Sequence, residues 1–196
     1  LLADPEVPVG SFCSGGLDSS LVAAIAADEI PNLHTFVVGM KDENGELSDD
    51  IKAARIAADH IGCTHHELLF TEDDYYEALP RVIQKLETYD PSLVRCAVPC
   101  YFTCKLAAEY VTVVLTGEGA DELFTGYHYM KHFPVDKLNA ESRRCVSNLH
   151  NIDLQRADRM GMFHSLELRV PFLDLDVVDL AMKIDPSLKI REHNGA

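Results

Sequence analysis

A glycine- and serine-rich segment separates a short apolar run from an alanine-rich one: Ser14-Gly15-Gly16-Leu17-Asp18-Ser19-Ser20. Its two glycines permit a tight turn that bares backbone N–H groups. A helix beginning there would add further N–H donors and the positive end of its dipole. The hydroxyls of Ser14, Ser19 and Ser20 could bind the same anion. The segment therefore predicts a phosphate-binding loop.

This loop contains no lysine to balance phosphate charge, which distinguishes it from a Walker A loop. It also lacks the three-glycine spacing of a dinucleotide fingerprint. A metal ion would then have to neutralise the phosphates, and Asp18 stands in the loop to hold one. The alternative is an ordinary Gly-Gly turn capped by a serine or an aspartate.

A second segment whose residues could take part in catalysis or binding follows the most strand-like run of the chain. It covers residues 116–127 and has the sequence T-G-E-G-A-D-E-L-F-T-G-Y. Its glycines permit close approach of the backbone, and Glu118, Asp121 and Glu122 place three carboxylates within five residues. Such acids repel one another, so a cation or a cationic partner is expected nearby. The alternative is a surface helix with an acidic first turn.

One anion-binding loop and one acidic loop are explained together if they form opposite sides of a single Mg·ATP site. In that site Asp18 and Asp121 would reach the metal. This hypothesis requires that the two segments, about a hundred residues apart in sequence, follow neighbouring strands of one sheet.

The first 115 residues alternate apolar runs with amphipathic stretches, the pattern of βαβ units. Strands are predicted at residues 7–13, 34–38, 65–70 and 111–115, with helices between them, including 19–29 and 48–61. The helix that begins after Thr71 carries Pro80, so it is expected to kink there or to be two pieces. The long crossovers predict a parallel sheet with helices on both faces, and ligands at the carboxyl ends of its strands.

From Gly117 onward the pattern becomes helical, with helices predicted at residues 120–124, 139–149 and 152–162, followed by a proline-containing connection. No linker, repeat or low-complexity tract interrupts the chain. We therefore expect one α/β domain over residues 1–196, with the parallel sheet in its first part and a helical C-terminal part.

The 196 residues carry 32 acidic and 17 basic side chains, a formal net charge of −15. This excess of acid argues against nucleic acid or an anionic membrane as partner. No apolar run approaches the ~18 residues that a membrane span needs, and the N-terminus has no secretory signal pattern. A soluble cytoplasmic protein is predicted. The absence of an initiating Met leads us to expect a piece of a longer chain.

Cys96, Cys100 and Cys104 recur at every fourth residue, so they would follow one drifting stripe of a helix. Without a C-x2-C pair they are interpreted as small buried side chains rather than as metal ligands. His128 and His132 share the i, i+4 spacing of a zinc helix but lack its glutamate, so no metal is expected there.

The first loop resembles the S-x-G-x-D-S loop of the PP-loop, or N-type, ATP pyrophosphatase superfamily. The second closely resembles the [ST]-G-E-G-[AS]-D-E-x-x-x-G-Y segment of the glutamine-hydrolysing, class B asparagine synthetases. Further segments agree with the synthetase domain of that family, in its order and near its spacing: residues 36–39 (F-V-V-G), 87–90 (E-T-Y-D), 156–159 (R-A-D-R) and 167–174 (E-L-R-V-P-F-L-D).

This resemblance implies a PP-loop fold, ATP and Mg²⁺ as cofactors, and aspartate and ammonia as partners. Aspartate and ATP would give β-aspartyl-AMP and pyrophosphate, and ammonia would then give asparagine and AMP. The resemblance places Asp18 and Asp121 on magnesium and gives Glu118 a proton-handling role, so these three form the predicted catalytic set. The predicted nucleotide contacts are Phe12, Ser14, Gly15, Gly16, Leu17, Asp18, Ser19, Ser20, Val38, Thr116, Gly117 and Glu118, of which Phe12, Val38 and Gly117 would line the adenosine pocket.

Two departures from the family bear on activity. The glutaminase domain that would supply ammonia is not in this chain, and the sequence stops at Ala196, before the family's K-E-x-F-S-D-G segment, whose lysine faces the phosphates. The 196 residues alone are therefore expected to bind ATP but to adenylate poorly. A β-lactam synthetase-like enzyme and a non-catalytic nucleotide-binding module stay open as alternatives, as does a homodimer.

Overall fold

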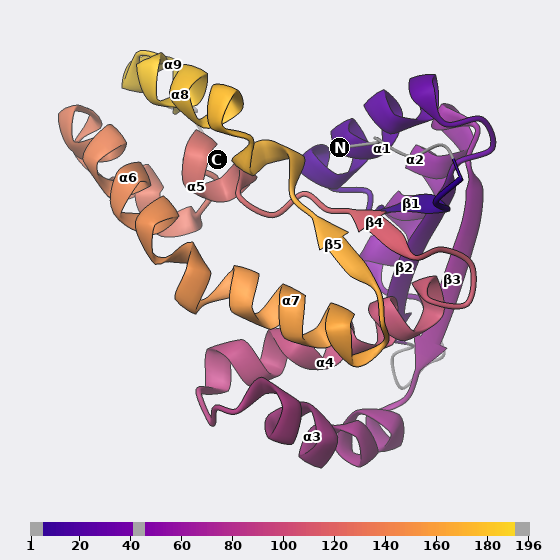
Figure 1. Cartoon of the computed structure of the whole chain (residues 1–196). Coiled ribbons are helices and arrows are strands. Elements are labelled where there is room, and N and C mark those ends of the chain that lie inside the picture. The colour runs from indigo at the N-terminus through magenta and orange to yellow at the C-terminus, as the bar shows by residue number, and fades with distance from the viewer. Residues whose placement is uncertain (1–5, 41–45, 191–196) are drawn as a thin grey trace.

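The computed structural model describes residues 6–40 and 46–190 (Figure 1). Five parallel strands form one sheet in the order β3-β2-β1-β4-β5. They are β1 (Val9–Phe12), β2 (His34–Met40), β3 (Thr64–Phe70), β4 (Val113–Leu115) and β5 (Glu167–Arg169). The first four lie where the apolar runs predict strands, and the parallel α/β class is confirmed.

Helices cover both faces of the sheet, as predicted (Figure 1). α1 (Leu17–Glu29) and α2 (Asp49–Ile61) pack on one face; α4 (Pro91–Ala107) packs on the other, beside α3 (Glu72–Leu86) and α7 (Asp153–Phe163). Successive strand residues point to opposite faces. Phe36 accordingly joins the core under α3 and α4, whereas Val37 joins Ile51 and Ala54 of α2.

Local sequence signals explain several helix ends. α2 ends at Gly62, which adopts the left-handed conformation (φ 81°) that glycine accepts without steric cost. Thr71 and Asp74 form a reciprocal capping box at the start of α3. Of the two alternatives predicted at Pro80, a kink or two pieces, the second is wrong, because α3 continues through the proline as one helix. Pro80 is exposed, and the apolar face of this helix, with Ala78, Val82 and Leu86, is buried on both sides of the proline.

The fifth strand corrects the prediction that strands end at residue 115. β5 follows α7 in the chain and pairs with β4 at the sheet edge. Its three residues, Glu-Leu-Arg, contain a single apolar side chain, too little for a periodic signal. Backbone hydrogen bonds position it: the Thr116 N–H donates to the Arg169 carbonyl at 2.9 Å.

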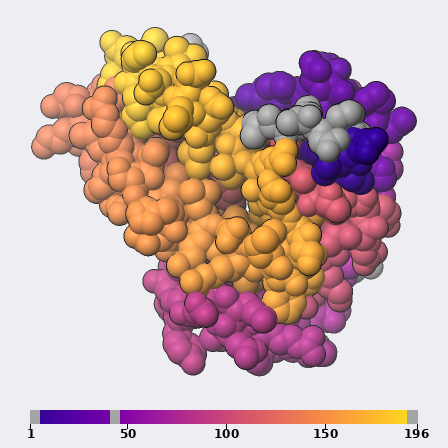
Figure 2. Space-filling model, viewed as in Figure 1, coloured from indigo at the N-terminus to yellow at the C-terminus, as the bar shows by residue number. Residues whose placement is uncertain are grey.

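The remaining helical region lies between β4 and the C-terminal end of the described chain. It contains α5 (Ala120–Phe124), α6 (Leu138–Asn148), α7, α8 (Leu175–Lys183) and α9 (Pro186–Lys189), with short 3₁₀ turns at His128–His132, Val135–Lys137, Leu149–Asn151 and Pro171–Leu173. The helices predicted at 120–124, 139–149 and 152–162 agree with α5, α6 and α7 within one residue at each end. Figure 2 shows a notch between the yellow segment of α8 and α9 and the indigo segment that includes α1.

The cysteine stripe on α4 is buried only in part. Cys104 is buried, Cys100 is partly exposed and Cys96 is exposed. Each step of four residues turns about 40° beyond a full helical turn. The stripe therefore rotates out of the core toward the N-terminal end of α4, and the prediction of three buried side chains is wrong for Cys96.

The strand order reverses between β1 and β4. The chain adds β2 and β3 on one side of β1, and then returns to place β4 on the other side. Such a switch point leaves a crevice beyond the carboxyl ends of the two strands, where ligands bind in open parallel sheets. The serine loop and the acidic loop follow these two strands.

Among the described residues, no helix combines the length and apolar composition needed to cross a bilayer.

Candidate active site

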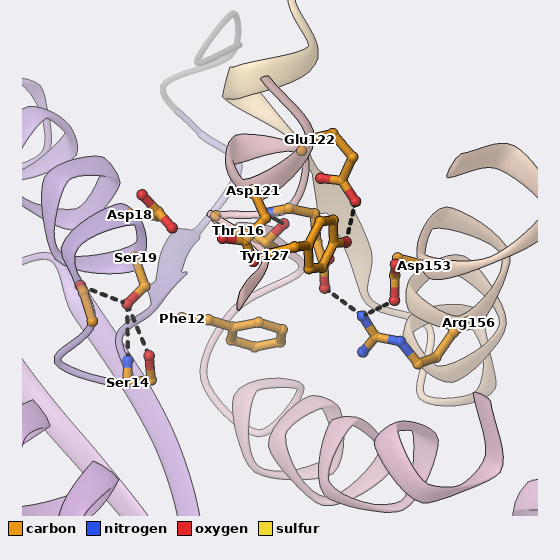
Figure 3. A pocket seen from close by; sticks show the side chains of 14 residues that line it. Phe12, Ser14, Asp18, Ser19, Thr116, Asp121, Glu122, Tyr127, Asp153 and Arg156 are labelled. Atoms are coloured by element: carbon orange, nitrogen blue, oxygen red, sulfur yellow. Dashed lines mark hydrogen bonds and ion pairs between the residues drawn. The ribbon is translucent and has the colours of Figure 1, made fainter. Parts of the chain in front are cut away.

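A cavity of about 420 Å³ lies at the switch point between β1 and β4 (Figure 3). Both loops line it, as the hypothesis of a shared site requires. Its walls are formed by Phe12, Ser14, Gly16, Asp18, Ser19, Thr116, Gly117, Glu118, Gly119, Asp121, Glu122, Tyr127, Asp153 and Arg156.

The serines of the first loop hold it in a closed turn. Ser19 Oγ accepts a hydrogen bond from the Ser14 N–H at 3.2 Å and lies 3.1 Å from Ser14 Oγ. The Ser19 hydroxyl also donates to the Gly16 carbonyl at 3.3 Å. Gly16 is the N-cap of α1, and its lack of a side chain leaves the first helical N–H groups without a side-chain cap. The beginning of this 13-residue helix can therefore receive an anion.

Four of the predicted nucleotide contacts lie outside the lining of this cavity: Gly15, Leu17, Ser20 and Val38. Leu17 is 82% exposed on the surface of α1, and Gly15 faces α2. Ser20 Oγ is buried and has no hydrogen-bond partner among the described residues. Val38 lines an adjoining cavity of about 240 Å³, which shares Phe12, Ser14, Ser19, Glu118 and Arg156 with the first.

Replacing Gly15 with Ala is expected to destabilise the protein by roughly 2–3 kcal/mol, combining backbone strain and overpacking. Gly15 has φ +80°, and a Cβ on it would overlap the backbone of Ala53 in α2. Gly16→Ala is the matched control, because the nearest atom to its Cβ, Ser14 Oγ, would lie at an ordinary 3.5 Å. Urea unfolding of both variants measures the difference. Equal losses of stability in Gly15→Ala and Gly16→Ala would show that the close approach of α2 does not require a glycine at position 15.

The two loops contact each other at Gly117. A Cβ on this glycine would lie 3.1 Å from the Ser19 backbone nitrogen and 3.3 Å from Asp18 Cβ, so the absence of a side chain lets the acidic loop approach α1. Burial raises the pKa of Asp18, and the nearby charge of Asp121 raises it further. The pKa of Asp121 is likewise raised, by burial and then by Asp153. The structure thus brings together the two carboxylates predicted to hold a metal.

Arg156 is the cationic partner that the acidic segment leads us to expect. Its guanidinium donates to Glu118 Oε1 at 2.7 Å and to Asp153 Oδ1 at 3.2 Å, and its side chain is only 11% exposed. Burial raises the pKa of Glu118, and the positive charge of Arg156 partly offsets this rise. The guanidinium therefore helps to keep a buried carboxylate ionised at the cavity wall.

Neither Arg156 nor Asp153 was predicted as a site residue. Arg156 lies in a segment that matches the family motif, and the crowding of acids gave a reason to look for a cation. Asp153 carries no sequence signal of its own. Both come from the first turn of α7, 35 and 38 residues after Glu118, and only the packing of that helix brings them to the cavity.

Glu122 and Tyr127 form the opposite end of the acidic wall. Glu122 is buried, and the Tyr127 hydroxyl donates a short hydrogen bond to its carboxylate. Burial raises the pKa of Glu122 despite this bond. Gly126 leaves room for the Asp121 carboxylate, which a Cβ at position 126 would overlap. The local turn thus holds Asp121 in place.

The described lining of the cavity contains five carboxylates and one guanidinium. An anion can enter such a cavity only with cations, because like charges in a partly desolvated space repel strongly. Within residues 6–40 and 46–190, no three His, Cys, Asp or Glu side chains form a cluster placed to hold a metal by themselves. Asp18 and Asp121 instead provide the one or two carboxylates with which proteins commonly hold Mg²⁺ alongside substrate phosphates.

Comparison with known proteins agrees with this geometry. A family model described as asparagine synthase matches residues 3–143 and 132–195. The chain belongs to the asparagine synthase family. The resemblance carried by the two loops is thereby confirmed.

Curated relatives in the asparagine synthase family match nearly the whole chain. A probable glutamine-hydrolysing asparagine synthetase of Dictyostelium discoideum is 41% identical over 94% of the chain and 35% of its own length. Its counterpart from Schizosaccharomyces pombe is 42% identical over 94% of the chain and 36% of its own length. Asparagine synthetase 3 of Arabidopsis thaliana is 40% identical over 94% of the chain and 33% of its own length. The chain spans about a third of the length of these relatives.

A solved structure, titled as a predicted subunit of a tRNA methyltransferase from Methanocaldococcus jannaschii, is a more distant match. It is 16% identical, with a TM-score of 0.45, over 88% of this chain and 73% of its own.

Proposed function

We propose that the chain is the adenylating part of an asparagine synthetase. Aspartate and ATP would give β-aspartyl-AMP and pyrophosphate, and ammonia would convert this intermediate to asparagine with release of AMP. The observation that carries the proposal is the meeting of the serine loop and the acidic loop at one cavity, in a chain of the asparagine synthase family. The relatives are named as glutamine-hydrolysing enzymes.

The chemistry of the two walls supports Mg·ATP as the ligand. The beginning of α1, with Ser14 and Ser19, provides donors for the pyrophosphate of ATP. Asp18 and Asp121 provide hard oxygen ligands for Mg²⁺. Burial and a neighbouring carboxylate raise the pKa of each, and a bound cation would offset both effects. Magnesium would supply the charge neutralisation that phosphoryl chemistry needs.

The adjoining cavity suits the nucleoside. Phe12 lies between the two cavities and contributes to both, and Val38 and Phe36 give the smaller one an apolar wall. Mostly apolar walls with a few placed polar groups are typical of sites for small molecules. Adenine in this side cavity and phosphates toward Ser14 and Asp18 would span the two spaces.

Glu118 is suited to accept a proton when ammonia attacks the acyl-adenylate. The group must be ionised to do so, and burial alone would favour its neutral form. The bond from Arg156 at 2.7 Å stabilises the ionised form and orients the carboxylate. Positioning and charge neutralisation would then supply most of the rate enhancement.

The direct test is aspartate-dependent ATP–pyrophosphate exchange by the protein expressed at the full length of its gene. Exchange that requires aspartate and Mg²⁺ supports the proposal, and AMP should appear when ammonia is added. Isolated residues 1–196 are expected to bind Mg·ATP with little exchange. Mg·ATP binding without exchange at full length would favour a non-catalytic module, and exchange with another carboxylate would favour a related adenylating synthetase.

A further inference from the structure

Two thiols on α4 lie close together beside the proposed nucleotide site. The sulfur atoms of Cys100 and Cys104 are 4.0 Å apart on one side of the helix. Cys104 is fully buried, whereas Cys100 is partly exposed in the wall of the 240 Å³ cavity, together with Glu118 and Arg156. Neither thiol has a role in the proposed amidation.

The surroundings of Cys100 favour its reactive form. The contact between the two sulfurs lowers the pKa of Cys100 below the ordinary value; burial opposes this change, and the positive charge of Arg156 supports it. Thiolates rather than thiols react with peroxides and other electrophiles. A thiol of lowered pKa beside a second thiol is the arrangement from which an oxidised cysteine passes to a disulfide.

We propose that Cys100 is a peroxide-modified thiol, that Cys104 is its resolving partner, and that the disulfide between them impairs the nucleotide site. The Cys100 thiolate attacks one oxygen of hydrogen peroxide, breaks the O–O bond and becomes a sulfenic acid, while the leaving hydroxide takes up a proton as water. Attack by the Cys104 sulfur then forms the S–S bond and releases a second water. The last part of this proposal, on nucleotide binding, rests on the proposed function.

The bond requires a local change in α4. The sulfurs must approach from 4.0 Å to about 2.05 Å, which draws residues 100 and 104 together across one helical turn. Pro99 has already removed one backbone hydrogen bond from the adjoining turn, because proline has no N–H to donate. The helix is therefore less constrained here than in a turn with all its bonds.

The change would reach the site through Arg156. Cys100 and Arg156 line the same smaller cavity, where the positive charge of Arg156 acts on the thiol, while the guanidinium donates its hydrogen bond to Glu118. Withdrawal of the sulfur into a disulfide would alter the wall of the smaller cavity next to Arg156 and Glu118, which also line the larger one. We expect the affinity for Mg·ATP to fall by roughly tenfold, an increase of one order of magnitude in Kd.

Trypsin offers a direct readout, because cleavage after Arg95 and Lys105 releases residues 96–105 with Cys96, Cys100 and Cys104 in one peptide. After treatment of the protein with hydrogen peroxide and blocking of free thiols, fragment-ion mass spectrometry should assign a bond between Cys100 and Cys104. Cys100→Ser and Cys104→Ser should abolish it. Cys96→Ser is the matched control, because Cys96 lies on the same helix and lines the same cavity but is not one of the two paired thiols, and this variant should retain the bond.

Calorimetric titration with Mg·ATP before oxidation, after oxidation and after reduction with dithiothreitol completes the test. Loss of affinity that dithiothreitol restores, in the parent and in Cys96→Ser but not in Cys100→Ser, supports the inference. No bond, or a bond to Cys96, would overturn it, as would a bond between Cys100 and Cys104 that leaves affinity unchanged. Failure of the reduced protein to bind Mg·ATP would instead refute the proposed function, while the peptide still decides the dithiol chemistry.

Discussion

Replacing Asp18 or Asp121 with Asn is expected to weaken Mg·ATP binding by roughly 100-fold or more. Changes to groups that only orient a metal ligand typically cost 10–100-fold in affinity, so loss of a ligand should reach at least the upper end. The two carboxylates belong to different loops that meet at Gly117. Either change should therefore remove one side of the same site, and titration calorimetry over a range of Mg²⁺ concentrations measures the loss.

Stability distinguishes this effect from misfolding. The pKa values of Asp18 and Asp121 are raised in the fold, so their ionised forms cost stability as the pH rises above the ordinary carboxyl range. The Asn variants lack this cost, so at neutral pH the midpoint of their urea unfolding should lie at the same urea concentration as that of the parent or at a higher one. Asp28→Asn, at an exposed position on α1, is the control and should bind Mg·ATP normally. Unchanged affinity in both Asp18→Asn and Asp121→Asn would disprove the shared metal site.

Replacing Arg156 with Met is expected to lower the free energy of unfolding by about 3–5 kcal/mol, the usual cost of removing one partner from a buried ion pair. Glu118 and Asp153 would both lose the guanidinium that now donates to them at 2.7 and 3.2 Å. Urea unfolding at neutral pH measures the loss. Arg143→Met, at an exposed position on α6, is the control and should stay within about 0.5 kcal/mol of the parent.

The pH dependence identifies the cause of this loss. Burial already raises the pKa of Glu118, and without Arg156 it should rise further. When a carboxyl group has a higher pKa in the folded state than in the unfolded state, the folded protein binds its proton more tightly. The free energy of unfolding therefore falls as the pH rises toward the folded-state pKa. The Arg156→Met defect should therefore grow with increasing pH and shrink in mild acid. A defect that is constant with pH would indicate lost packing rather than an unpaired carboxylate.

The sequence by itself determined the features that depend on neighbouring residues. Apolar runs and their spacing located four strands and the helices between them, since a buried face imposes its period on the chain. Gly62 and Thr71 marked helix ends because each satisfies a requirement of its own turn. The two loops carried their chemistry in contiguous residues. Their place at one edge followed from parallel pairing, which long crossovers require.

The tertiary structure alone decided which distant groups meet. Glu118 and Arg156 are 38 residues apart, and the packing of α7 brings them together. Gly15 lies in the phosphate-loop motif, yet the neighbouring helix α2, not the cavity, sets its requirement for glycine. β5 has almost no apolar signal and is held by backbone bonds to the edge of β4. Cys100 lines a cavity because α4 packs against β2 and β3. Residue types and short spacings specify local conformation and the chemistry available, whereas long-range contacts depend on how helices pack against the sheet.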